Sequence, residues 1–153
     1  MNAYDKYRGQ SEKIIKDRAY HATAQLDGTY SKELKGKHVG RYYHEWGMDT
    51  WIKYGDWLAA PRDPKFFTGK RIILRQIPGA SLLATSIDED FIIDQTVFIA
   101  KPKSDTCNVY YFLGLINSKL MSYYFKFKND ETDEIFPKVK LENFKMFPVK
   151  EGE

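Results

Sequence analysis

The side chains best suited to chemistry in this sequence are basic, and they concentrate between residues 31 and 76. That segment holds ten Lys and Arg residues against five Asp and Glu residues. A surface with this charge balance suits a polyanion such as DNA. Arg forms paired hydrogen bonds with guanine, and Gln does so with adenine, so these residue types are candidates for reading bases. The base-reading candidates are Arg62, Lys65, Arg75 and Gln76.

Other basic side chains are candidates for phosphate contacts, which position a protein on DNA without reading its sequence. These candidates are Lys37, Lys53, Lys70 and Arg71. Arg41 is similarly placed, although a structural ion pair explains it equally well. Lys119 could extend from a helix toward DNA or toward a partner domain. For each cation the simpler alternative is a solvated surface charge, where Lys and Arg are usually found.

Residue patterns that would indicate catalysis are weak or missing. No two glycines have G-x-G spacing, and neither the dinucleotide fingerprint nor a Walker loop is present. The sequence also lacks an Asn/Asp-Pro-Pro-aromatic string and a glycine-rich loop for S-adenosylmethionine. His38 and His44 could share a metal only if they met, but on the strand expected here they would lie about 20 Å apart. We therefore predict no catalytic residue, metal or cofactor in this chain.

One nuclease-like pattern is the triplet Glu33-Leu34-Lys35, with Asp27 upstream. Magnesium-dependent nucleases hold an Asp, a second acid and a Lys on adjacent strands. Residues 31–34 are expected to form a helical turn that ends at Gly36, which would not place the triplet along a strand. A small metal-dependent nuclease using Asp27, Glu33 and Lys35 is therefore the weakest of the alternatives.

Hydrophobic periodicity predicts the elements that must position these side chains. Ser11 is a candidate N-cap for a helix over residues 12–22, and Asn108 for a long helix over residues 109–127. Strands are predicted at residues 38–46, 50–54, 71–77, 82–87, 91–100 and 138–140, with a helical turn at 141–144. We expect an α+β fold with a twisted, mostly antiparallel sheet, because the connections between strands are short.

The helix over residues 109–127 is apolar around most of its circumference. A helix of this kind is predicted to be buried rather than laid on the surface. Asn117 falls opposite the short polar arc of this helix. We predict that its amide is buried and bonded to backbone, because an unpaired buried amide costs about 1–3 kcal/mol.

The length of 153 residues predicts one domain. We expect residues 1–9 to be a truncated linker and the chain to be the C-terminal fragment of a larger enzyme. The longest apolar run, residues 109–116, is far shorter than the roughly 20 residues that a membrane span needs. Cys107 is the single cysteine and cannot form an internal disulfide, which fits a cytoplasmic protein.

Five sequence blocks, in order along nearly the whole chain, carry a resemblance. The blocks are residues 36–43 with Trp46; Pro61-Arg62, Phe66-Phe67 and residues 69–75; Ala84-Thr85 with Asp88; residues 113–120 with Tyr123-Tyr124-Phe125; and residues 136–139 with 147–149. Together they resemble the TaqI-like C-terminal specificity domain. The block in the predicted long helix is the most specific of the five.

The resemblance implies a target-recognition domain that belongs to adenine-specific DNA methyltransferases and type II restriction enzymes. Its partners would be double-stranded DNA and the methyltransferase domain of the same polypeptide. Methylation, S-adenosylmethionine binding and cleavage would belong to other domains, so this chain would be the non-catalytic specificity part. Because the base-reading loops vary most within such a family, the resemblance assigns no base contact. The main alternative is a protein-interaction module whose aromatic surface docks a partner subunit.

Overall fold

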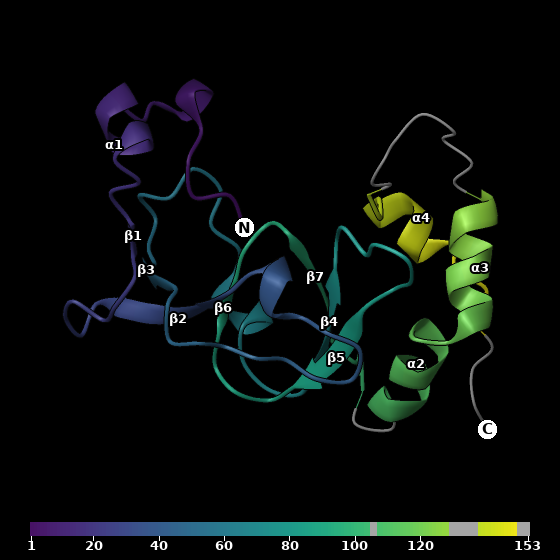
Figure 1. Cartoon of the computed structure of the whole chain (residues 1–153). Coiled ribbons are helices and arrows are strands. Elements are labelled where there is room, and N and C mark those ends of the chain that lie inside the picture. Colours follow the sequence, from purple (N-terminus) through teal and green to yellow (C-terminus); the bar gives the residue numbers. More distant parts are fainter. Residues whose placement is uncertain (105–106, 129–137, 150–153) are drawn as a thin grey trace.

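The fold is a mixed α+β arrangement in which two sheets are followed by helices, as seen in the computed structural model (Figure 1). The structure describes residues 1–104, 107–128 and 138–149. Helix α1 (Glu12–Lys16) and the first sheet lie at one end, the second sheet lies in the middle, and the later helices lie at the other end (Figure 1). The predicted α+β class is confirmed, although the strands form two sheets instead of one.

The first sheet has four strands in the order β1-β3-β2-β6. Their bounds are His21–Ala22 for β1, Trp51–Lys53 for β3, Tyr30–Leu34 for β2 and Ile92–Ile93 for β6. All neighbours are antiparallel except β2 and β6, which run parallel with Leu34 opposite Ile93. The helical turn predicted at residues 31–34 is therefore wrong. Ser31 instead pairs with Ile52, so tertiary pairing overrides the local pattern.

The second sheet has three antiparallel strands, β5 (Ala84–Ile87), β4 (Arg71–Arg75) and β7 (Val97–Ala100), with β4 in the centre. Successive side chains of a strand point to opposite faces. Ile72 and Leu74 join the core that faces the later helices, and Ile73 joins the core on the other side. Both faces of β4 are covered, which explains its nearly continuous apolar sequence.

The helices begin where the sequence provides caps. The Ser11 hydroxyl accepts the Ile14 N–H at the start of α1, and Asn108 accepts two backbone N–H groups at the start of α2 (Val109–Ile116). Both predicted N-caps are confirmed. The remaining helices are α3 (Lys119–Lys128), α4 (Leu141–Lys145) and the short 3-10 helices η1 (Lys6–Arg8), η2 (Gly36–His38) and η3 (Pro64–Phe66). In the described part of the chain, no helix is long and apolar enough to cross a membrane.

The long helix predicted over residues 109–127 is instead two helices that meet at Asn117 and Ser118. Asn117 is 2 % exposed. Its side chain accepts the Ala84 N–H at 3.0 Å and donates to the Ala84 carbonyl at 2.9 Å. The prediction of a buried amide bonded to backbone is confirmed. The prediction of all-round burial is wrong, because Tyr123 and Phe127 are largely exposed.

Further segments also differ from the sequence predictions, and the helix expected over residues 12–22 ends at Lys16. Residues 38–46 form no continuous strand, and only one bridge joins Val39 to His44. Residues 91–100 are split between β6 and β7, and residues 138–140 carry no strand. The expected linker at residues 1–9 packs against the domain, because Met1 and Ala3 are buried beside Ile52. Residues 136–137, from the last resembling block, lie outside the described residues.

The Asn117 amide predicts a stability effect. We expect Asn117→Ala to lower the free energy of unfolding by about 2–3 kcal/mol, because both backbone groups of Ala84 would lose a buried partner. Urea unfolding followed by circular dichroism measures this loss. The exposed amide of Gln95 provides the control, and Gln95→Ala should change stability by less than about 0.5 kcal/mol. Equal effects of the two substitutions would contradict a structural role for Asn117.

Candidate nucleic-acid interface

The loop over residues 39–44 folds back on itself at the surface and is held by backbone contacts. The Gly40 N–H donates to the Tyr43 carbonyl at 3.0 Å, and Val39 bridges His44. Tyr42, at the tip, has a φ of 70°, in the left-handed region that non-glycine residues rarely adopt. Its N–H donates to the Ala84 carbonyl at 2.9 Å, which anchors the tip to β5. Sheet contacts thus offset the local strain.

Gly40 allows the Tyr43 ring to pack closely against the backbone of the loop. The Tyr43 ring lies directly over it, and a Cβ on residue 40 would come within 2.3 Å of that ring. Any larger residue would push Tyr43 out of its present position. Tyr43 is 61 % exposed, so the loop holds a large aromatic ring at the surface.

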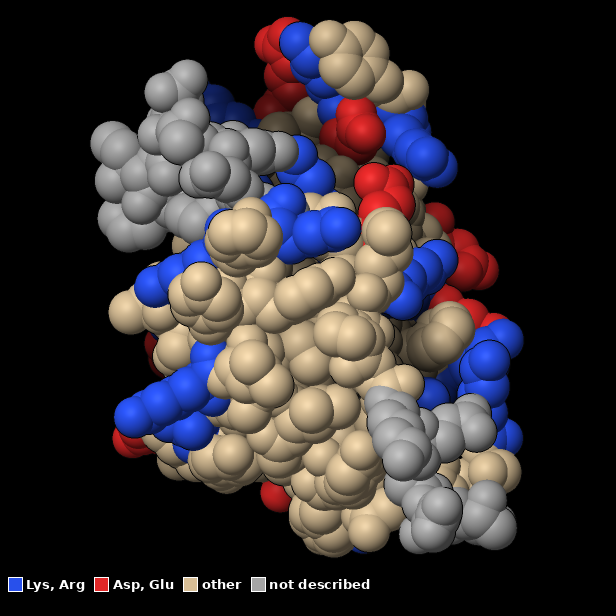
Figure 2. Space-filling view, turned by 90° about the vertical axis from the view of Figure 1, so that its right-hand side faces the viewer, with Lys and Arg blue, Asp and Glu red and all other residues tan. Residues whose placement is uncertain are grey.

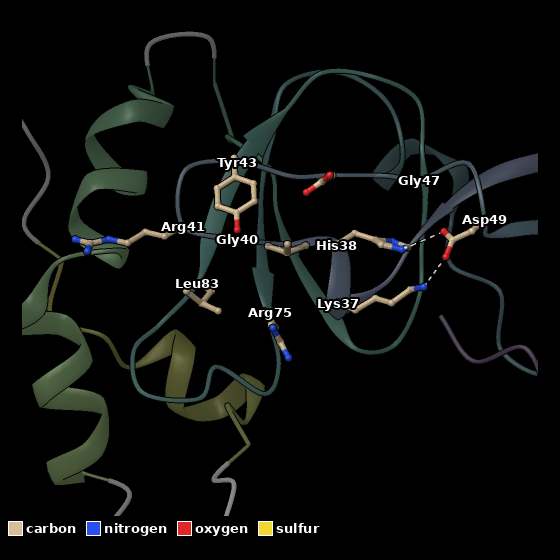
Figure 3. Close-up of a pocket in the computed structure, with 11 residues that line it drawn as sticks. Lys37, His38, Gly40, Arg41, Tyr43, Gly47, Asp49, Arg75 and Leu83 are labelled. Atoms are coloured by element: carbon tan, nitrogen blue, oxygen red, sulfur yellow. Dashed lines mark hydrogen bonds and ion pairs between the residues drawn. The ribbon is translucent and has the colours of Figure 1, made fainter.

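Beside this loop lies an open groove of about 460 Å³. It brings together three of the predicted DNA-contacting residues: Lys37 from η2, Arg41 from the loop and Arg75 from the end of β4. In Figure 3, Lys37 and His38 point toward Asp49 at one end of the groove, and Arg41 extends in the opposite direction. Three cations from separate elements therefore line one concave surface, together with the carboxylates of Glu45 and Asp49.

Lys37, His38 and Asp49 form a polar cluster at one end of the groove. The Lys37 ammonium lies 2.7 Å from Asp49 Oδ2, and this hydrogen bond holds the pKa of the Asp49 carboxyl below its usual range. The His38 Nδ1 accepts the Lys35 N–H at 3.1 Å, so the neutral ring carries its proton on Nε2. Burial and the neighbouring Lys37 lower the His38 pKa, so the neutral ring is favoured.

The Nε2–H of His38 is an unused donor. It lies 3.5 Å from Asp49 Oδ1 and has no hydrogen-bond partner in the described part of the chain. The His38 residue is 7 % exposed. An unpaired buried donor costs about 1–3 kcal/mol, so its position at the groove calls for an explanation.

Other predicted contacts lie outside the groove, on exposed or half-buried surface. Lys65 pairs with Asp63 at 2.7 Å, Lys53 lies over the Trp57 ring, and Lys70 lies over the Tyr110 ring. Lys119 is exposed at the start of α3.

Arg62 is half-buried, with its guanidinium 3.5 Å from the Val97 carbonyl, and burial lowers its pKa. Gln76 is half-buried directly after β4.

Arg71 does not fit the predicted role of a phosphate contact. Its side chain is fully buried, and it donates to the carbonyls of Gly69 at 2.7 Å and Glu89 at 2.9 Å. Burial lowers its pKa, while Asp90 and Asp88 oppose that shift. The central position of β4 explains the error, because a cation at this point of the strand faces the interior. Arg71 joins the start of β4 to the turn before β6.

The residues of the nuclease-like pattern do not form an open site. Glu33 is fully buried, with His21 Nε2 3.1 Å from one carboxylate oxygen and Lys35 Nζ 3.1 Å from the other. Asp27 is exposed and bonds to Thr29. Within the described ranges, no group of three or more His, Cys, Asp or Glu residues could hold a metal ion. Although the triplet starts on a strand, its carboxylate serves a buried ion-pair cluster.

Sequence reasoning missed two residues that shape the groove. Asp49 lies between the strands predicted at residues 38–46 and 50–54 and received no role, and His38 was considered solely as a metal ligand. The adjacency of Lys37 and His38 was visible in sequence, but the approach of Asp49 depends on how residues 39–48 fold back. Tyr43 contributes to the same groove lining.

The structure thus defines a mixed α+β domain with a groove that gathers cations from three elements. The family model of the TaqI-like C-terminal specificity domain matches residues 31–149, so the chain belongs to this family. Membership implies DNA target recognition in restriction-modification enzymes. The comparison with curated proteins gives no match. All the residues that line the groove fall within the matched segment.

The burial of Arg71 predicts that its loss affects stability. We expect Arg71→Met to lower the free energy of unfolding by about 2–4 kcal/mol, because two carbonyl groups lose a charged donor. Chemical unfolding measures this change. The matched control is Arg75→Met, at the other end of the same strand, which should cost less than about 1 kcal/mol. A larger loss from Arg75→Met than from Arg71→Met would contradict this assignment.

Proposed function

We propose that this chain recognises a specific sequence in double-stranded DNA as the specificity part of a restriction-modification enzyme. The observation that carries the proposal is the groove lined by Lys37, Arg41 and Arg75, within the segment that matches the family. A concave basic surface attracts the DNA backbone and brings side chains close to base edges.

The groove residues would divide the work of binding. Lys37 carries a compact, mobile charge suited to a phosphate, whereas the planar fork of Arg75 suits the paired acceptors of guanine. Arg41 lies over the Tyr42 ring, 5.4 Å from its centre, and is held outward for contact with a neighbouring phosphate. Lys70 remains exposed outside the groove and would extend the phosphate contacts.

The chain would supply recognition while another domain supplies the chemistry. In this proposal the partner is an adenine-specific DNA methyltransferase domain of the same polypeptide, in a methylase or a fused type II restriction enzyme. That domain would bind S-adenosylmethionine, and this chain would need no cofactor. The enzyme would act in the cytoplasm, where the DNA lies.

The division of work predicts different outcomes for two groove variants. Lys37→Ala should weaken binding to all duplexes and reduce the slope of log K against log salt concentration by about 0.9, because one phosphate contact is lost. Arg75→Ala should cost about 10-fold or more in affinity for the preferred duplex and relax the preference at one base pair. Fluorescence anisotropy over a salt series with randomised labelled duplexes measures both effects.

The control for these variants is Lys13→Ala, which removes an exposed lysine on α1 at the other end of the molecule. It should leave affinity, salt slope and preference unchanged. Duplex binding that does not respond to salt would contradict a phosphate-dominated interface.

A second observation supports the protein partner. At the end formed by the later helices, Leu120, Tyr123 and Phe127 expose one face of α3, with exposed fractions of 73 %, 66 % and 74 %. Figure 2 shows this end as a broad uncharged area with Lys and Arg around its edge. The opposite face of α3, with Met121 and Phe125, is buried in the core. A helix that is apolar on both faces is suited to lie between two layers.

The chemistry of this face fits a protein surface with an apolar centre and carboxylates at its edge. Residues 109–128 contain three lysines and no Asp or Glu, so two copies of this face would repel each other. Tyr123 and Phe127 already stack on each other at 6.2 Å, and Lys70 lies 4.9 Å from the centre of the Tyr110 ring. Because these contacts already cover one face of each ring, packing against a protein is favoured over stacking with bases.

The apolar face of α3 predicts a docking effect. Leu120→Glu combined with Phe127→Glu should weaken binding of the separately expressed methyltransferase domain at least 10-fold, because two acids would face an apolar, acidic-edged surface. Isothermal titration calorimetry measures this affinity. Leu26→Glu is the matched control, since Leu26 is 67 % exposed and lies outside the helical end. An equal loss with Leu26→Glu, or none with the double variant, would contradict docking on α3.

A further inference from the structure

We propose that Asp49 occupies a phosphate-binding site in the free protein and is displaced when a phosphate oxyanion binds between Lys37 and His38. This inference rests on the proposed function and adds to it the position of one phosphate and the two groups that bind it. The site would accept a tetrahedral oxyanion, whether it belongs to a DNA backbone or to free phosphate.

Asp49 directs its two carboxylate oxygens toward two different donors. Oδ2 lies 2.7 Å from the Lys37 ammonium, and Oδ1 lies 3.5 Å from the Nε2 of His38 (Figure 3). An oxyanion held by an ammonium and an imidazole N–H would use the same two donors. The Asp49 carboxylate therefore occupies the position, between Lys37 and His38, that a bound phosphate oxyanion would take.

Asp49 provides a hydrogen-bond acceptor for only one of the two donors at this site. The Nε2–H of His38 has no hydrogen-bond partner among the described residues, and 3.5 Å is beyond the usual N–H···O distance. The carboxylate is carried by a turn that the Trp51 indole fixes through a hydrogen bond to the Met48 carbonyl at 2.9 Å. A mobile oxyanion is free of that constraint and can approach both donors.

Another anion can replace Asp49 in its ion pair with Lys37 at little cost in stability. The side chains of Lys37 and Asp49 are 57 % and 49 % exposed, and ion pairs at such a surface contribute little to stability. An incoming backbone phosphate would also meet the field of Arg75 and Arg41, which line the same groove and outnumber Glu45, the remaining acid of its lining once Asp49 has turned away. Asp49 would then turn into solvent, and Lys37 would keep a negative partner throughout.

The test compares two aspartates in matched ion pairs. Asp49 and Asp63 each lie 2.7 Å from a lysine, and each side chain is 49 % exposed, but only Asp49 lines the groove and faces a buried imidazole. Asp49→Asn should tighten duplex binding about 3- to 10-fold at 100 mM salt, while Asp63→Asn should change it less than about 2-fold. Fluorescence anisotropy with a labelled duplex measures both.

Two outcomes of this comparison would overturn the inference. Equal tightening by both substitutions would show a general effect of removing negative charge. Unchanged or weaker binding by Asp49→Asn would show that Asp49 is only a structural anchor. In the Lys37→Ala background, Asp49→Asn should tighten binding less, because only one of the two groups that Asp49 blocks, His38, remains.

A second measurement needs no variant. Nuclear magnetic resonance of the ¹⁵N-labelled full chain should show the His38 Nε2 resonance shift on titration with inorganic phosphate or with duplex DNA. A shift with both probes identifies the oxyanion itself as the ligand, and a shift with duplex alone identifies the DNA backbone as the source. No shift with either probe would overturn the inference.

The two levels of proposal fail in different ways. If inorganic phosphate shifts the His38 resonance but no duplex binds, the phosphate site stands and DNA recognition fails. If duplex binds with the expected salt dependence while Asp49→Asn has no effect, DNA recognition stands and the displacement of Asp49 fails.

Discussion

The backbone of Ala84 is the point on which the rest of this structure depends. Its N–H and carbonyl bond to the buried Asn117 amide at the junction of α2 and α3, and the same carbonyl also accepts the Tyr42 N–H from the groove loop. Ala84 lies on β5, an edge strand whose outward backbone groups need partners. The backbone of this one residue thus bonds the edge of the sheet to the junction of α2 and α3 and to the loop over residues 39–44, which carries Arg41.

This arrangement gives the molecule two surfaces with different chemistry that share one support. The groove is polar and basic, and its walls come from η2, the loop over residues 39–44 and the end of β4. The exposed face of α3 is apolar and lies at the end formed by the later helices. The proposed binding of DNA on one side and of a catalytic partner on another would need a rigid connection between the two surfaces. The central strand β4, covered on both faces, and its neighbour β5 provide that connection.

Charged residues that look alike in the sequence differ in whether the fold buries them or leaves them at the surface. Arg71 and Arg75 stand four residues apart on one strand, yet Arg71 is fully buried and Arg75 reaches the groove. Glu33 is likewise buried and is compensated by His21 and Lys35. Buried charges of this kind are paired or hydrogen-bonded because an isolated one would be very costly. The buried charges stabilise the fold, and the charges around the groove that stay accessible are the ones proposed to contact DNA.

The sequence by itself determined the α+β class, the N-caps at Ser11 and Asn108, and the buried, backbone-bonded amide of Asn117. These features follow from local periodicity and from hydrogen-bonding groups that must find partners. Only the tertiary structure decided which cations meet in the groove, that Asp49 lies against Lys37 and His38, and that one face of α3 stays exposed. Those outcomes depend on how distant segments pair and cover one another, which spacing along the chain does not specify.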